Sequence, residues 1–223
     1  MTGNKSPQAP NRRPIKFRSS PFAQSAASWL AHKRVTPNQI SLASIGFAGL
    51  AAVCLVLAPH ATGFSAVFLM LLAAIFIQSR LLCNLLDGMV AIEFAQETPS
   101  GSLFNDAPDR LSDSLILIAA GYATTDIAGV TFWGWAAALS SVMTAYARTL
   151  CASAGAPMRF QGPMSKSHRM ALITLACLLT ACETLLAVGH YSFFVVLLIT
   201  TIGSLITTWR RLRDGYMFLQ NKH

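Results

Sequence analysis

Charged residues of both signs are scarce in this sequence, and acidic residues are the scarcest. Only 9 of 223 residues are Asp or Glu, and charged residues make up 12% of the chain, against ~25% in an average soluble domain. Hydrophobic residues make up 53% of the chain and the mean hydropathy is +0.49. These values exclude an ordinary soluble domain and indicate a polytopic membrane protein with one compact domain.

The sequence also lacks cysteines at metal-ligand spacing and an apolar segment at its N-terminus. The five cysteines fall inside apolar runs without metal-ligand spacing, so they predict neither a metal site nor a disulfide framework. Residues 1–20 are polar and basic and lack the apolar core of a signal peptide. We expect them to form a disordered cytoplasmic arm.

Apolar stretches separated by turn signals predict six transmembrane helices. The expected spans are 39–57, the first half of 65–95, 102–123, 130–154, 169–188 and 191–208. Residues 22–33 have apolar side chains at helical spacing and predict an interfacial amphipathic helix, with a short connector as the alternative. The predicted fold class is therefore an all-α integral membrane protein with six transmembrane helices and an N-terminal interfacial amphipathic helix. The predicted membrane domain spans 21–215, and 216–223 form a cytoplasmic tail.

Lysine and arginine are absent from alternate loops, which predicts the topology. Loops 58–63, 124–129 and 189–190 contain neither residue, whereas the N-terminal arm, loop 155–168 and the C-terminal stretch are basic. By the positive-inside rule, both termini and the turn near residue 100 face the cytoplasm. The net charge of +8 then reflects topology, and no nucleic-acid partner is expected.

The few acids gather in one stretch, residues 84–113. A carboxylate held inside a membrane costs at least ~2.5 kcal/mol, so such a cluster indicates a functional site. Six of the nine acids lie there: Asp87, Glu93, Glu97, Asp106, Asp109 and Asp113.

Helical spacing brings several of these oxygen-bearing side chains onto two facing surfaces. Asn84 and Asp87 are three residues apart, and Asn105, Asp109 and Asp113 recur every four, so each set shares a helix face. A short turn joins the two helices, which makes them antiparallel neighbours. Carboxylate and amide oxygens that converge in this way suit Mg²⁺ or Mn²⁺. The alternative is a proton or cation relay of a transporter, but the acids lie at the cytoplasmic end and no second repeat accompanies them.

The spacing resembles the signature of the CDP-alcohol phosphotransferase family, D-x2-D-G-x2-A-R-x8-G-x3-D-x3-D. The matching positions are Asn84, Asp87, Gly88, Ala91, Ile92, Gly101, Asn105 and Asp109. The start of the first span at 37–41 and the loop 162–167 also resemble this family, so the resemblance covers about residues 22–213. Asparagine replaces the first and third aspartates, and Ile92 replaces the arginine. A YnbA-like bacterial branch of the family carries asparagine at the same two positions.

The resemblance implies a membrane enzyme of phospholipid synthesis. Such an enzyme transfers a phosphatidyl group from a CDP-linked lipid, usually CDP-diacylglycerol, to an alcohol and releases CMP, with two Mg²⁺ or Mn²⁺ ions at the pyrophosphate. Asp109 would be the general base. The expected metal ligands are Asn84, Asp87, Asn105 and Asp109, and the helical spacing adds Asp113 as a source of missing negative charge. The residues expected at the nucleotide are Asn38, Gly88, Ala91 and Gly101.

Basic and hydroxyl side chains near the acidic stretch are candidates for phosphate binding. They are Arg148, Arg159, Lys166 and Ser167. For Arg159 and Arg169, a role in topology or lipid-headgroup binding is an equal alternative. Arg80 lies one turn before Asn84 and is a candidate partner for a site acid. The isolated Glu183 is expected to be paired, protonated or near the outer interface rather than catalytic.

These hypotheses imply a bacterial inner-membrane location and a defined set of partners. They are a CDP-linked lipid donor, an alcohol acceptor, membrane lipids and, where the resemblance extends to assembly, a second copy in a homodimer. Two rival functions stay open: a non-catalytic relative that binds CDP-lipid or anionic lipid, and a small cation transporter. CMP release separates the first rival from an enzyme, and metal-dependent CDP binding argues against the second.

Overall fold

A computed structural model describes residues 20–94, 101–158 and 161–221, and within these ranges it contains helices but no strand. The prediction of an all-α fold is therefore confirmed. The helices are α1 (Pro21–His32), α2 (Pro37–Leu57), the short 3-10 helix η2 (Ala58–His60), α3 (Phe64–Glu93), α4 (Gly101–Ala120), α5 (Val130–Ser153), α6 (Lys166–Leu185) and α7 (Ser192–Gln220).

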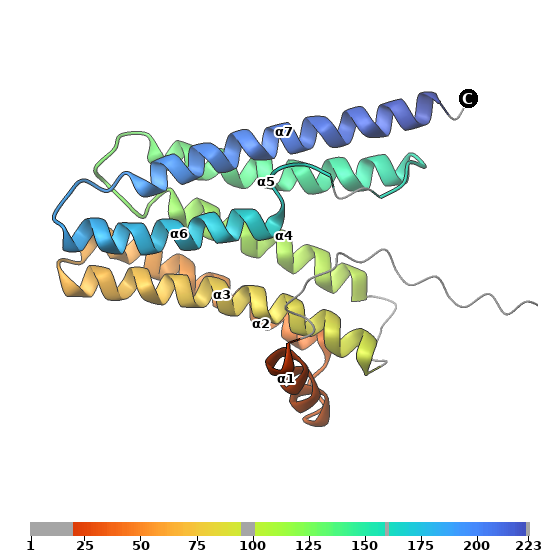
Figure 1. The fold of residues 1–223 in the computed structure, drawn as a ribbon, viewed down its shortest axis with the longest axis horizontal. Coiled ribbons are helices and arrows are strands. Elements are labelled where there is room, and N and C mark those ends of the chain that lie inside the picture. Colours follow the sequence, from red (N-terminus) through yellow and green to blue (C-terminus); the bar gives the residue numbers. More distant parts are fainter. Residues whose placement is uncertain (1–19, 95–100, 159–160, 222–223) are drawn as a thin grey trace, which may run out of the picture.

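Helices α2 to α7 form a bundle, and α1 crosses it at a steep angle (Figure 1). The links α2–α3, α4–α5 and α6–α7 lie at one end of the bundle, and the C-terminal ends of α3, α5 and α7 lie at the other. Helix α2 packs against α3 and α4, α3 packs against α6, and α5 packs against α7. The end that carries the C-terminus therefore also carries the acidic stretch.

Within the described ranges, four helices are long and apolar enough to cross a membrane: 37–60 with η2 included, α3, α6 and α7. The chain is thus a helical membrane protein. Helices α4 and α5 do not meet the same criterion of length and composition, although they pack within the same bundle. A topology of six spans stays a prediction.

Two glycines allow α4 and α5 to cross closely. A Cβ built on Gly134 would lie 2.7 Å from the Cα of Gly121, and a Cβ on Gly121 would lie 2.9 Å from the Cα of Gly134. No side chain fits between backbones at this distance, and small residues at helix crossings are typical of membrane proteins. The crossing holds α4, which carries Asp109, against α5, which carries Arg148.

Local sequence signals set where the helices begin. Thr36 forms a capping box with Gln39, with the side chain of each residue bonded to the backbone N–H of the other, as the Thr-Pro start predicted. The Oγ of Ser165 accepts a hydrogen bond from the backbone N–H of His168 and caps α6. Helix α6 therefore begins at Lys166, three residues before the predicted start.

One further boundary differs from the prediction, and one predicted helix is found. The last span was predicted to end at 208, before a run of arginines, but α7 continues to Gln220 and includes most of the predicted tail. Charged residues end a membrane span but do not end a helix, because Arg is a good helix former. The predicted helix at 22–33 corresponds to α1, whose Ala23 and Ala27 pack against α3 residues such as Met89.

Candidate active site

Asp87 lies near the C-terminal end of α3 with its carboxylate facing into the bundle. Its side chain is buried, and its Oδ2 accepts a hydrogen bond of 2.5 Å from the Oγ of Ser41 on α2. Its Oδ1 is buried and makes no hydrogen bond within the described residues, and the same holds for the Nδ2 of Asn84, one turn earlier. Buried polar atoms normally have partners, so this face of α3 is suited to an added ligand.

A network of ion pairs lies next to Asp87 on α4. The guanidinium of Arg80 on α3 contacts Asp109 Oδ1 at 3.3 Å and Asp113 Oδ1 at 2.7 Å. The side chain of Arg80 is fully buried. The expectation that Arg80 pairs with a site acid is therefore confirmed, and it pairs with two.

Asp113 is held between two arginines. Its second oxygen, Oδ2, contacts Arg169 on α6 at 3.1 Å, and Asp113 is 1% exposed. Arg169 also donates a hydrogen bond to the carbonyl of Met164. Both carboxylate oxygens of Asp113 are thus occupied by internal cations, which favours a role in holding Arg80 and Arg169 in place. The hypothesis that Asp113 supplies charge to a metal stays a prediction.

Lys166 completes the network from the N-terminus of α6, where its Nζ contacts Asp109 Oδ2. The preceding loop is fixed on α7, because the backbone N–H of Met164 donates to Thr207 Oγ1 at 3.0 Å. Gly162 has a φ of +124°, and a Cβ there would collide with Thr207. The sequence Gly-Pro-Met-Ser therefore positions Lys166 over the acids of α4.

The other residues expected at the metal or the nucleotide are less buried than these acids. Asn105 lies one turn before Asp109 on α4 but is exposed, whereas Gly101, Gly88 and Ala91 are half-buried. Asn38 is half-buried on the first turn of α2. The structure therefore brings Asp87, Asp109 and Asp113 into the interior and leaves the asparagine of α4 at the surface.

The described residues fit a metal ion with a mixed donor set. No group of three or more His, Cys, Asp or Glu in the described ranges is arranged to hold one. The buried Oδ1 of Asp87 has no hydrogen-bond partner within these ranges, and carboxylate and amide oxygens are ligands of Mg²⁺ and Mn²⁺. Asn84, one turn earlier on α3, would add its amide oxygen. A metal would therefore bind through both residue types.

Arg148 on α5 meets the acid that faces away from the buried network. Its Nη2 contacts both carboxylate oxygens of Asp106 at 3.3 Å, and Arg110 contacts the same carboxylate. Asp106 therefore binds two arginines at the surface and takes no part in the ion pairs of Asp109 and Asp113. Ser167 is exposed, and Arg159 lies outside the described residues, so their phosphate roles stay predictions.

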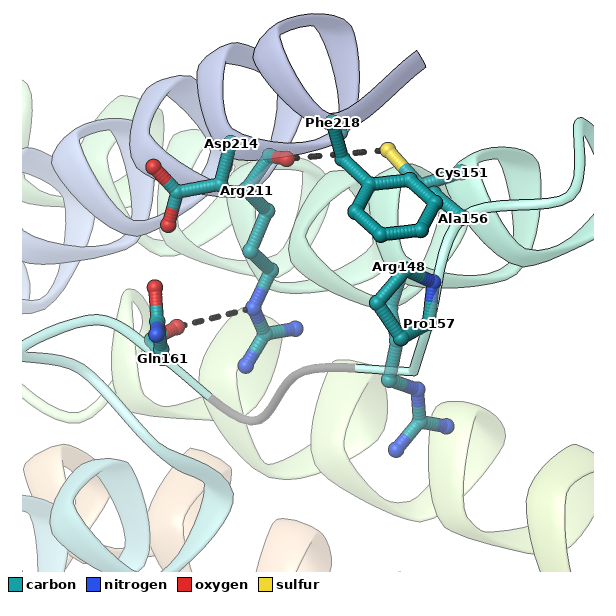
Figure 2. A pocket seen from close by; sticks show the side chains of 9 residues that line it. Arg148, Cys151, Ala156, Pro157, Gln161, Arg211, Asp214 and Phe218 are labelled. Atoms are coloured by element: carbon teal, nitrogen blue, oxygen red, sulfur yellow. Dashed lines mark hydrogen bonds between the residues drawn. The ribbon is translucent and has the colours of Figure 1, made fainter. Parts of the chain in front are cut away.

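A pocket beside Arg148 contains a second arginine, Arg211, that was not among the predicted site residues (Figure 2). Arg211 Nε donates to the carbonyl of Gln161 at 3.0 Å, and its Nη1 donates to the carbonyl of Thr144. The pocket is lined by Arg148, Cys151, Ala156, Pro157, Gln161, Arg211, Asp214, Gly215 and Phe218. Arg211 lines this pocket because α7 continues beyond residue 208. In the sequence, Arg211 stands out only as one member of a basic run.

Ser41 is the other residue that the sequence analysis did not single out as a site residue. It lies in the 37–41 segment that resembles the family, and only the fold shows its contact with Asp87. At the opposite end of the bundle, Glu183 Oε1 accepts hydrogen bonds from the backbone N–H groups of Tyr191 and Ser192 and from the Ser192 hydroxyl. Of the alternatives for Glu183, the structure therefore shows a hydrogen-bonded side chain.

Comparison of the structure with solved structures identifies the fold. It matches that of the Mycobacterium tuberculosis phosphatidylinositol phosphate synthase PgsA1 with CDP-DAG bound, with a TM-score of 0.73 and 16% identity over 88% of this chain and 94% of the other. The same synthase in complex with manganese and citrate matches with a TM-score of 0.70 and 17% identity over 87% and 88%. The chain has the fold of this synthase, and the resemblance to CDP-alcohol phosphotransferases is confirmed at the level of the fold.

One sequence relative lies closer in sequence than these structures. The inner membrane protein YnbA of Escherichia coli strain K12 is 28% identical over 147 residues, which cover 66% of this chain and 69% of that protein. No family model matches the chain. The similarity to YnbA agrees with the branch that the two asparagines indicated.

Proposed function

We propose that this chain is a CDP-alcohol phosphotransferase that transfers a phosphatidyl group from a CDP-linked lipid to an alcohol. The observation that carries the proposal is the placement of Asp87 and Asp109, two acids of the family signature, beside Lys166 and Arg80 at one end of a bundle with the synthase fold. A related structure with CDP-DAG bound makes CDP-diacylglycerol the first donor to test.

The reaction is a displacement at phosphorus. The acceptor oxygen forms a bond to the phosphorus of the lipid phosphate, the bond from that phosphorus to the bridging pyrophosphate oxygen breaks, and CMP leaves with the electron pair. The hydroxyl proton passes to Asp109 Oδ2, which the acceptor must reach beside Lys166. A positioned base of this kind contributes ~10²–10⁴ in rate.

The other side chains bind and orient the phosphates. Mg²⁺ or Mn²⁺ held at the signature positions, with Asp87 and Asn84 of α3 as ligands, would screen the charge of the pyrophosphate. Lys166 reaches the lipid phosphate from α6, since its ammonium already lies at Asp109. Arg148, Arg159 and Ser167 would bind phosphate oxygens by charge-assisted hydrogen bonds.

The nucleotide would bind beside Gly88 and Ala91 of α3 and near the start of α2. Gly88 and Ala91 leave room for the cytidine beside Asp87, with Asn38 and Gly101 at the rim. In the membrane, α2 to α7 would all cross and place this end at the cytoplasmic interface, where α1 rests among the headgroups. Membrane lipid supplies the donor and accepts the product.

The test is CMP release by the purified protein given CDP-diacylglycerol, Mg²⁺ or Mn²⁺ and a panel of alcohols, followed by identification of the lipid product. Asp109→Asn should lower the rate of CMP release by ~10²–10⁴. Glu93→Gln changes an exposed carboxylate on α3 in the same way and should leave the rate unchanged.

Each contrary outcome favours a named alternative. CDP-lipid binding without CMP release would indicate a non-catalytic lipid-binding relative. Cation uptake into vesicles without any CDP binding would indicate a transporter. Wild-type CMP release by Asp109→Asn would remove Asp109 as the base.

A further inference from the structure

The buried charges at the site already balance. Arg80 lies between Asp109 and Asp113, Lys166 contacts Asp109 and Arg169 contacts Asp113. Asp87 adds the third carboxylate. The balanced set consists of three cations and three anions: Arg80, Lys166 and Arg169 with Asp87, Asp109 and Asp113.

The two departures from the family signature change how much added charge the site can hold. Asn84 and Asn105 each keep one oxygen donor but remove a negative charge, so the signature positions carry two carboxylates in place of four. An ion next to Asp109 would also face Lys166 and Arg80, because both carboxylate oxygens of Asp109 contact these cations. Like charges at such short range repel strongly where water is excluded.

The two acids of the family signature, Asp87 and Asp109, differ in the number of cations that contact them. Asp87 Oδ2 accepts a hydrogen bond from the neutral hydroxyl of Ser41, and Asp87 forms no ion pair in the described part of the chain. Asp109 has a cation on each oxygen. Asp87 and Asn84 therefore form the side of the site that can accept a divalent ion, and Asp109 forms the side that is already neutralised.

We propose that this site binds one divalent cation, at Asp87 and Asn84, and that the ammonium of Lys166 takes the position of a second one. Lys166 then bridges Asp109 and a phosphate oxygen of the substrate, as a metal ion would. The proposal rests on the proposed function, because it assigns the phosphate contact of Lys166 within that reaction. It makes Lys166 a determinant of metal stoichiometry.

The experiment counts bound Mn²⁺ on the purified full-length chain by the loss of the free-ion signal in electron paramagnetic resonance, with MnCl₂ as the only added ligand. The wild type should bind one ion per chain at saturation. Lys166→Gln should bind a second ion, and Lys166→Arg, which keeps the positive charge, should bind one. Size-exclusion chromatography checks that each variant is folded, and Lys166→Met serves as a second neutral variant.

Three results would overturn the proposal: two ions on the wild type, none on the wild type, or the same count in the wild type and the folded neutral variants. A failure of the proposed function would give a different result. A wild type that binds one Mn²⁺ and releases no CMP would defeat the proposed reaction and leave the ion count intact. CMP release by a wild type with two bound ions would defeat only the inference about Lys166.

Discussion

Arg80 is the residue around which the buried polar groups of this membrane bundle are arranged. Its guanidinium is fully buried and contacts two aspartates of the next helix along the chain. Removing a charge from water costs several kcal/mol unless partners of opposite charge surround it. Arg80 and Asp113 therefore depend on each other, and the alignment of α3 with α4 depends on both.

Asp113→Asn should destabilise the fold more than it affects chemistry. The change leaves Arg80 with Asp109 alone and Arg169 without a carboxylate partner among the described residues, and breaking a buried ion pair costs ~3–5 kcal/mol. The free energy of unfolding can be measured by SDS titration of the protein in mixed micelles. The matched control is Asp106→Asn, whose carboxylate is half-exposed and should contribute less than ~1 kcal/mol.

The same variant also tests the sequence-based hypothesis for Asp113. If Asp113→Asn keeps wild-type stability and raises the Mg²⁺ or Mn²⁺ concentration needed for half-maximal CMP release, Asp113 supplies charge at the metal. If stability falls and the metal titration of the folded fraction is unchanged, its role is to hold the two arginines.

At the scale of elements, the crossing of α4 and α5 is the most constrained contact. Gly134→Ala would place a methyl group 2.7 Å from the Cα of Gly121, so the helices must separate. Overpacking of this kind costs ~1–3 kcal/mol, which should lower the thermal midpoint of the detergent-solubilised protein. Gly49→Ala on α2 is the control, because nothing lies within 4 Å of its added Cβ. Equal midpoints for both variants would show that the crossing is looser than the structure indicates.

The links α4–α5 and α6–α7 are joined by Asp126 and His190. The backbone N–H of His190 donates to Asp126 Oδ2 at 2.9 Å and lowers the pKa of this carboxyl; the His190 ring adds to the effect, and desolvation opposes it. Because the folded pKa is below the unfolded value of ~3.9, the contact stabilises the fold above that value. The stabilisation is lost as the pH falls through the folded pKa.

Hydrogen exchange measures this contact directly. Protection of the His190 amide, corrected for intrinsic rates, should be high at neutral pH and should decrease below about pH 4. In Asp126→Ala the amide should exchange rapidly at both pH values. Protection that survives in this variant would show that another group holds the link.

The sequence could predict the helices because their apolar runs are long and their starts carry caps such as Thr36. It could also place Asp87 and Asp109 at one end, since the turn between α3 and α4 is short. It could not place Asp113 between arginines, because helical periodicity gives the face of a residue but not the side chains of a third helix. Arg211 was missed for a related reason: a run of arginines indicates a membrane boundary, and only the packing of α7 on α5 shows that the helix continues past it.

At the scale of the whole molecule, the distribution of Lys and Arg predicts that both termini are cytoplasmic. In a variant without native cysteines, a cysteine introduced at Thr62 or Thr125 should react with an impermeant thiol reagent added outside intact cells. A cysteine at Ser6 or Gln220 should react only after the membrane is permeabilised. External labelling of Ser6→Cys would reverse the topology and separate the site from cytosolic nucleotide.

Helix α7 contacts two residues of the loop that precedes Lys166. Thr207 binds the backbone of Met164, and four residues later Arg211 binds the carbonyl of Gln161. An anionic ligand in the pocket of Figure 2 would compete with Gln161 for the guanidinium of Arg211 and would release one of these two attachments. We therefore expect thermodynamic coupling between occupancy of the pocket and the position of Lys166, so that an anionic acceptor changes the apparent affinity for the CDP-linked donor, and the donor changes the affinity for the acceptor by the same factor.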